Sequence, residues 1–167
     1  MKINESIKEP VYIPIQSITD DRGILIPFTD NIDGNMIRRG YYVENYGRGI
    51  IRGLHYHRKE IKMFIMAHGA AKFNTLKLPL DIAERNNNVE IEKYYADNPD
   101  ALKSYVMSSR HHALLVVPPL YANGWVGLEH DSLLFSLSNL EFEEAQHDDI
   151  RIDPYIIGKE KWEVIGR

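Results

Sequence analysis

Short runs of β-branched and aromatic residues recur along the chain, and residues typical of turns separate them. Such side chains fit the half-buried surface of a sheet, so the pattern predicts many short strands and few helices. Turn signals such as Asp33-Gly34 and Asn123-Gly124 punctuate the runs. Strands are expected at residues 11–15, 23–28, 41–43, 63–66, 71–78, 104–107, 113–117, 132–137 and 150–152. This spacing favours an antiparallel all-β domain, either a barrel or a sandwich.

Two segments depart from the strand pattern. Residues 82–103 are polar and charged, and we interpret them as an insertion or long loop with one short helix after Asp100. Residues 158–167 are charged around a single tryptophan, and they are expected to form a short helix that docks through Trp162. No internal repeat or Gly/Ser linker divides the chain, so residues 1–167 are expected to form one domain.

Composition narrows the class of protein. The chain has 167 residues, of which 44% are hydrophobic and 26% charged, a balance typical of globular proteins. Lys and Arg are scattered without a basic stripe, which argues against a nucleic-acid surface. The absence of cysteine excludes disulfides and thiolate chemistry. Because residues 1–10 lack an apolar signal core and no long apolar run follows, we expect a soluble cytoplasmic protein without membrane attachment.

The most unusual motif is Arg52-Gly53-Leu54-His55-Tyr56-His57, with Lys62 shortly after it. Residues two apart on a strand face the same side, so both histidines should point in one direction. Three interpretations are open: a pair of metal ligands, two histidines satisfied by neighbours, or a general base at His55. The metal interpretation lacks a third histidine, because the later motif has Asn123 and Glu60 is poorly spaced as a ligand. The residues alone do not decide among these.

Three motifs in order resemble the dTDP-4-dehydrorhamnose 3,5-epimerases. They are Asp20-Asp21-Arg22-Gly23, then Arg52-Gly53-Leu54-His55-Tyr56, then Pro118-Pro119-Leu120-Tyr121-Ala122-Asn123-Gly124-Trp125. The resemblance covers nearly the whole chain apart from residues 82–103. It implies a cupin jelly-roll barrel with a few short helices that needs neither a metal nor an organic cofactor.

The reaction implied by this resemblance is removal of a proton next to the ketone of a nucleotide-linked 4-keto-6-deoxyhexose. The ketone acidifies the neighbouring C–H bonds, so such an enzyme needs a base and a cation near the oxygen. His55 matches the family's base and Lys62 its lysine. The carboxylate that partners the base matches Glu160 best, with Asp153 as second choice.

The resemblance also suggests which residues contact the substrate, a dTDP- or CDP-linked sugar. Arg22 and Arg52 match positions that contact the diphosphate, for which a guanidinium fork is well suited. Further substrate contacts are expected from Asn45, His57, Arg110, Tyr121, Asn123 and Phe135. The family usually forms homodimers by exchange of N-terminal strands, a part that residues 11–15 could play. The implied pathway is the synthesis of a deoxysugar for a surface polysaccharide such as an O-antigen of lipopolysaccharide.

The chain also differs from the family pattern. The family's catalytic tyrosine is replaced by Phe135, a later tyrosine by Leu140, and a motif histidine by Asn123. Phenylalanine cannot donate a proton. The first interpretation is therefore epimerisation at C3, with C5 as a further site. The alternatives are 3,4-keto isomerisation, in which one base shuttles the proton, and a nucleotide-sugar-binding protein without activity.

Overall fold

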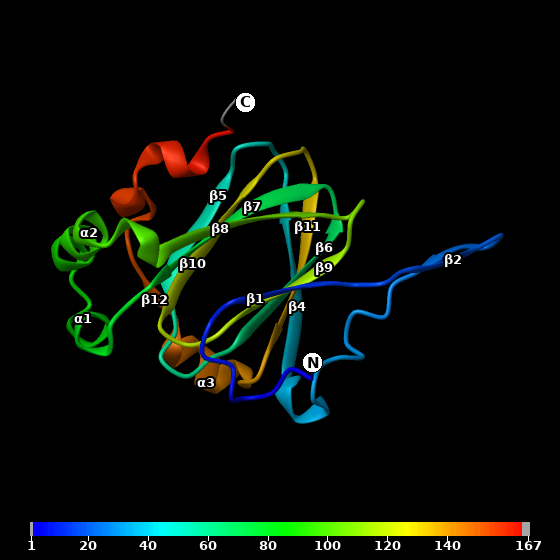
Figure 1. The fold of residues 1–167 in the computed structure, drawn as a ribbon, viewed down its shortest axis with the longest axis horizontal. Helices are drawn as coiled ribbons and strands as arrows, with labels where there is room; N and C mark the ends of the chain where they lie inside the picture. Colours follow the sequence, from blue (N-terminus) through cyan, green and yellow to red (C-terminus); the bar gives the residue numbers. More distant parts are fainter. Residues whose placement is uncertain (1, 165–167) are drawn as a thin grey trace.

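Two antiparallel sheets of five strands dominate the computed structural model, which describes residues 2–164 (Figure 1). The first sheet has the order β1 (Val11–Pro14), β9 (Ala113–Val117), β6 (Lys62–His68), β11 (Ser132–Ser138) and β4 (Arg39–Asn45). The second has the order β12 (Ile150–Arg151), β5 (Ile51–Tyr56), β10 (Tyr121–Gly127), β7 (Ala70–Lys77) and β8 (Leu102–Ser108). Each of the nine predicted runs overlaps a strand, so the all-β prediction is confirmed.

The core lies between the sheets. Phe64 and Leu134 from the first sheet pack with Phe73 and Trp125 from the second, and all four are buried. In β11 the side chains alternate, so Leu134 and the serines of this strand face inward while Phe135 faces outward. Because these inward serines are small, that part of the interior is not filled by large side chains.

Residues 82–103 are more helical than expected. The segment contains the end of α1 (Leu80–Arg85), all of α2 (Asn88–Asp97) and a 3₁₀ turn, η2 (Pro99–Ala101). The Asn87 side chain caps α2 by accepting the backbone N–H groups of Val89 and Glu90. Ala83 and Ile91 are fully buried in a core cluster that also covers β7. A local cap and the burial of Ala83 and Ile91 thus help to order a mostly polar segment.

The C-terminal segment docks as predicted over its described part. It forms η3 (Pro154–Ile157) and η4 (Lys159–Trp162), and the buried Trp162 donates its Nε1–H to the Pro154 carbonyl at 2.8 Å. Residues 165–167 of the predicted helix lie outside the described residues. Two other short elements are η1 (Gly34–Met36) and α3 (Phe142–Asp148).

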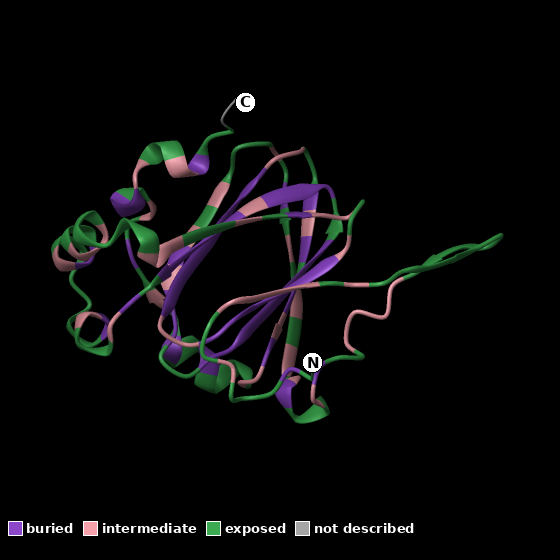
Figure 2. Cartoon of the chain, viewed as in Figure 1, coloured by how far each residue is buried: buried purple, intermediate pink, exposed green. Residues whose placement is uncertain are grey.

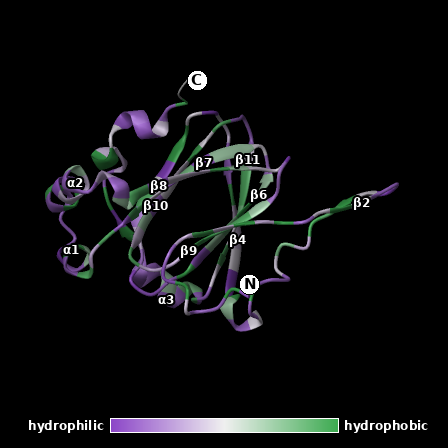
Figure 3. Cartoon of the chain, in the orientation of Figure 1, coloured by the Kyte–Doolittle hydropathy of each residue, from purple (hydrophilic) through white to green (hydrophobic). Residues whose placement is uncertain are grey.

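A hairpin of β2 (Ile18–Asp20) and β3 (Gly23–Leu25) projects from the barrel as an arm (Figure 1). It is exposed along its length (Figure 2), although some of its residues are hydrophobic (Figure 3). Ile18, Ile24 and Leu25 are each more than half exposed. Among residues 2–164, no helix combines the length and hydrophobicity needed to cross a membrane.

Candidate active site

A cavity of about 680 Å³ lies between the two sheets, beside the end of α3. The first sheet contributes Tyr41 and Lys62, the second contributes Arg52, His55 and Asn123, and Asp149 enters just after α3. Five residues singled out from the sequence therefore meet in one place: Arg52, His55, His57, Lys62 and Asn123. This volume is within the usual range for small-molecule sites.

The glycines of the two motifs let β5 and β10 approach closely behind this cavity. Gly53 has a φ of +109°, and a Cβ there would lie 2.7 Å from the Asn123 carbonyl oxygen. A Cβ on Gly124 would lie 2.8 Å from the Arg52 carbonyl oxygen. Such contacts exclude any larger residue. Both motifs, Arg-Gly-Leu-His on β5 and Asn-Gly-Trp on β10, therefore require glycine at the point where the two adjacent strands meet.

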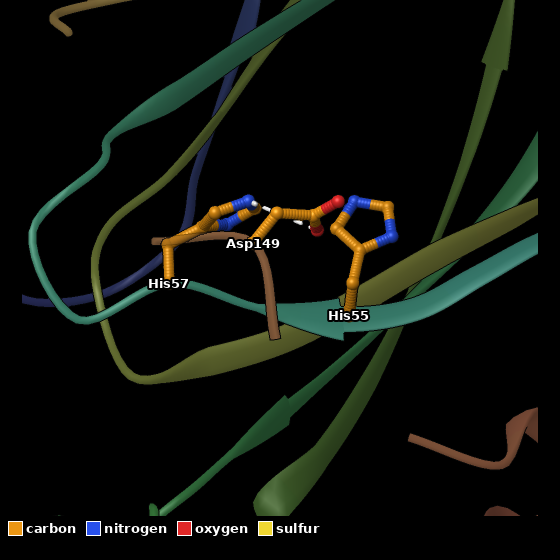
Figure 4. A group of neighbouring side chains, drawn as sticks. All are labelled: His55, His57 and Asp149. Carbon is orange, nitrogen blue, oxygen red and sulfur yellow. Dashed lines mark ion pairs between the residues drawn. The ribbon is translucent and has the colours of Figure 1, made fainter. Parts of the chain in front are cut away.

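Asp149 lies between the two histidines (Figure 4). The rings of His55 and His57 are 5.3 Å apart between centroids, with an angle of 75° between their planes. Asp149 Oδ1 is 3.7 Å from His57 Nε2, and the nearest atoms of all three residues lie within 4.8 Å of one another. Two potential proton acceptors therefore share one carboxylate.

The surroundings keep both imidazoles neutral near pH 7. Burial is the main cause that lowers the pKa of His55, while the Asp149 carboxylate opposes this effect. Burial also lowers the pKa of His57, with smaller contributions from His55 and Lys62, to about 3. A neutral imidazole can accept a proton, which is the first requirement for a general base.

A buried ion pair lies beside the histidines. Lys62 Nζ donates to Glu60 Oε1 at 2.6 Å and to the Tyr41 hydroxyl at 3.1 Å. Ser138 donates its hydroxyl to the same Glu60 oxygen at 2.5 Å. Glu60 Oε2 lies 3.1 Å from His57 Nε2. Sequence reasoning had considered Glu60 only as a metal ligand and had missed Tyr41, which reaches the cavity because alternate residues of β4 face inward.

Asp148 holds the loop that carries Glu60. Its carboxylate accepts three backbone N–H groups, from Arg58 at 2.9 Å and from Lys59 and Glu60 at 2.8 Å each. Asp148 ends α3, and Asp149 follows it directly. The end of one helix thus fixes the loop with one carboxylate and presents the next carboxylate to the histidines.

Two hydrogen bonds to β4 hold the side chain of Arg52 in place. Its Nε donates to Asn45 Oδ1 at 2.6 Å, and its Nη2 donates to the Glu44 carbonyl at 3.1 Å. Asn45 is fully buried and does not line the cavity, so its expected contact with substrate is replaced by support of Arg52. Asn123 lines the cavity and donates its side-chain N–H to the His55 carbonyl at 3.2 Å.

The two carboxylates expected to partner His55, those of Asp153 and Glu160, lie outside the cavity. Asp153 caps η3 by accepting the Tyr155 N–H at 2.8 Å, and Glu160 lies exposed in η4, and neither lines the cavity. After β12 the chain leaves the cavity and packs against α2, so these residues are carried away from the histidines. Asp149 takes the position expected for them. In the sequence, Asp149 was marked only by its position four residues before Asp153. It lies at the end of α3, a helix that the sequence had not predicted.

Phe135 and Tyr121 also lie apart from this cavity. Phe135 faces outward from β11 and stacks on Phe28 with ring centroids 6.3 Å apart. Because position 135 faces away from the cavity, no side chain at this position could donate a proton to a substrate there. Tyr121 lines a second cavity of about 590 Å³, where burial raises its pKa to about 12.

The two remaining arginines are on the surface. Arg110 forms a bidentate pair with Glu129, with N–O distances of 2.6 and 2.9 Å. Arg22 pairs with Asp20 in the projecting arm, and its side chain is 86% exposed. Neither lines the cavity of its own chain, because strand pairing places the arm and the Arg110 turn away from β5.

His55, His57 and Asp149 are also the side chains that could approach one metal ion. Two features disfavour a metal there. His57 Nε2 is closer to Glu60, at 3.1 Å, than to Asp149, at 3.7 Å. The Lys62 ammonium lies near enough to lower the pKa of both histidines, and the same charge would repel a cation. We therefore interpret the group as acid–base residues, and the absence of a metal stays a prediction.

No family model matches the chain, and no curated protein matches it. Solved structures do match. The sugar 3,4-ketoisomerase QdtA from Thermoanaerobacterium thermosaccharolyticum, in complex with TDP, is 22% identical with a TM-score of 0.62, over 89% of this chain and 92% of that chain. The 3'-monoepimerase ChmJ from Streptomyces bikiniensis, in complex with dTDP-quinovose, is 14% identical with a TM-score of 0.69, over 93% and 74%. The rmlC epimerase of Mycobacterium tuberculosis is 13% identical with a TM-score of 0.68, over 96% and 75%. These likenesses confirm the predicted fold, a cupin jelly-roll barrel.

Proposed function

We propose that the protein is a sugar-nucleotide isomerase that moves the ketone of a nucleotide-linked 4-keto-6-deoxyhexose from C4 to C3. One observation carries this proposal: His55 near the end of β5 and His57 directly after the strand both line the cavity, with Asp149 between them. A base on one face of the sugar can take the proton from C3 and deliver it to C4. His55 is the proposed base, and Lys62 is the proposed cation for the enolate oxygen.

The similarity in chain length supports this choice. The alignment with the 3,4-ketoisomerase spans nearly all of both chains, whereas the two epimerases extend well beyond the aligned part. The sequence had favoured epimerisation at C3, and this remains the second candidate. Tyr41 favours it, because its hydroxyl enters the cavity from the sheet opposite His55. An acid on that side could return the proton to the other face of C3.

The substrate is proposed to be a nucleoside diphosphate sugar. Three arginines line the cavity, Arg39, Arg52 and Arg151, and guanidinium groups suit the oxygens of a diphosphate. Thymidine is the first choice of nucleoside, since the similar solved structures hold TDP or dTDP-quinovose, and cytidine is the second. The proposed setting remains the cytoplasmic synthesis of a deoxysugar for a surface polysaccharide, without an organic cofactor.

A homodimer is proposed through the arm at residues 18–25. The strand expected to exchange, β1, pairs with β9 of the same chain, from Val11 opposite Val116 to Pro14 opposite Ala113. The arm beyond it exposes Ile18, Ile24 and Leu25, which a second copy would cover. In that arrangement Arg22 could serve the cavity of the other copy, which would reconcile its predicted role with its position.

Proton NMR in deuterium oxide with fresh dTDP-4-keto-6-deoxyglucose tests the function. A ketoisomerase gives a 3-keto product, with either the transferred proton or deuterium from solvent at C4, whereas a C3 epimerase places deuterium at C3 and leaves the ketone at C4. His55→Asn should remove either activity while dTDP still protects the variant against thermal unfolding. If wild type leaves the substrate unchanged but is protected by dTDP, the protein is a binding module and the proposal fails.

A further inference from the structure

The inward face of β11 carries three buried serines, Ser132, Ser136 and Ser138. Two of their hydroxyls have partners. The Ser132 hydroxyl lies 3.0 and 3.1 Å from two backbone carbonyl oxygens, and the Ser138 hydroxyl donates to Glu60 Oε1 at 2.5 Å. Ser136 is 1% exposed, and its hydroxyl has no hydrogen-bond partner among residues 2–164. One polar group of this strand is therefore left free.

Ser136 belongs to the wall of the cavity that lies opposite His55. In the first sheet β11 runs between β6 and β4, and Ser136 is paired with Phe64 on one side and Tyr41 on the other. All three residues line the cavity, and His55 lines it from the second sheet. A sugar ring bound between the sheets would therefore have the base on one side and Ser136 on the other.

The free hydroxyl is unfavourable for the protein alone. A buried polar group without a partner costs free energy, and alanine at position 136 would avoid that cost. A serine side chain turns readily between staggered positions, so a ligand in the cavity can draw the hydroxyl toward itself. Because the hydroxyl is neutral and has no hydrogen bond to an acid or a base, it is suited to donate a hydrogen bond and not to transfer a proton.

We propose that Ser136 is a specificity-determining residue that donates a hydrogen bond to the C2 hydroxyl of the sugar, so that the enzyme selects 2-hydroxy sugars over 2-deoxy sugars. This proposal rests on the proposed isomerase function. In that reaction the C3 hydroxyl becomes the new ketone, and the C4 oxygen is assigned to Lys62. The C2 hydroxyl keeps its proton throughout, so a neutral donor apart from the acid–base residues suits it.

The test compares dTDP-4-keto-6-deoxyglucose with its 2-deoxy analogue in wild type and in Ser136→Ala. The ratio of kcat/KM for the two sugars should favour the 2-hydroxy sugar about 10-fold more in wild type than in the variant, as expected for one hydrogen bond. The variant should lose kcat/KM with the 2-hydroxy sugar and keep it with the 2-deoxy sugar. An equal loss with both sugars, or an unchanged ratio, would overturn the proposal.

Ser132→Ala is the matched control, because it removes a hydroxyl from the same face of β11 at a position that does not line the cavity. It should leave the sugar ratio unchanged and lower the urea midpoint, since a satisfied hydrogen bond is lost. Ser136→Ala should not lower the midpoint, because the hydroxyl that it removes has no partner. A lower midpoint for Ser136→Ala would assign the hydroxyl a structural role and overturn the proposal.

Calorimetry with dTDP-glucose and dTDP-2-deoxyglucose separates this proposal from the proposed reaction, because neither sugar has a ketone. Wild type should bind dTDP-glucose about 10-fold more tightly than Ser136→Ala does, whereas the two proteins should bind dTDP-2-deoxyglucose equally. A wild type that turns over neither keto sugar refutes the proposed function. Equal binding of dTDP-glucose by wild type and Ser136→Ala refutes the contact with the C2 hydroxyl independently.

Discussion

Asp148 offers a direct test of how the site is held together. It is 8% exposed, and its carboxylate accepts the backbone N–H groups of Arg58, Lys59 and Glu60 at 2.8 to 2.9 Å. Asp148→Ala removes the acceptor of all three donors at once. The loop that carries Glu60 should then loosen, and the protein should lose stability.

The size of the loss follows from these contacts. A hydrogen bond to a charged group contributes about 1.5 to 3 kcal/mol. The N–H groups of Arg58 and Lys59 belong to exposed residues and can recruit water, whereas Glu60 is buried and its N–H is left without a partner. We therefore expect Asp148→Ala to lower the free energy of unfolding by about 3 to 5 kcal/mol. Asp148→Asn keeps one acceptor oxygen, so about half that loss is expected.

Urea unfolding followed by circular dichroism measures this free energy. The neighbouring variant Asp149→Ala is the matched control, because the hydrogen bonds of Asp149 are long ones from the exposed Arg151, at 3.4 and 3.5 Å. It should change stability by less than about 1 kcal/mol but abolish turnover. A loss below about 1 kcal/mol for Asp148→Ala, or a larger loss for Asp149→Ala, would refute this account of the loop.

Three further outcomes are expected. Because burial holds the pKa of His57 at about 3 in the folded state, below that of unfolded histidine at about 6.5, stability should fall as the pH drops below 6.5. Urea titrations should show a slope of up to about 1.4 kcal/mol per pH unit from this residue, and His57→Gln should reduce it. Arg52→Lys should weaken dTDP binding about 10-fold in calorimetry, since lysine lacks the guanidinium fork that Asn45 orients; unchanged affinity would contradict a diphosphate contact. Ile24→Asp should convert a dimer to a monomer in light scattering, and a monomeric wild type would refute the role of the arm.

Local sequence patterns determined most of the strands and some of the residues that line the cavity. Short β-branched runs specified the strands, because alternation and turn residues act over a few positions. The same alternation placed His55 and His57 on one side of β5. The interpretation of Asn123-Gly124 as a turn was wrong, because both residues lie inside β10, where a side chain on Gly124 would collide with the Arg52 carbonyl oxygen. The sequence therefore identified His55, Lys62 and Arg52, which line the cavity.

The tertiary structure decided which residues surround that base. Asp149, Glu60 and Tyr41 reach the cavity from the end of α3, from a loop and from the opposite sheet. No local spacing relates these positions to His55, so the sequence assigned the carboxylate to Asp153 or Glu160 instead. Resemblance gives the order of the motifs, but it does not show that the end of α3 presents Asp149 to the cavity, or that the turn after β12 carries Asp153 and Glu160 away from it. That turn is set by long-range packing of η3 against α2 and β5, which a motif does not encode.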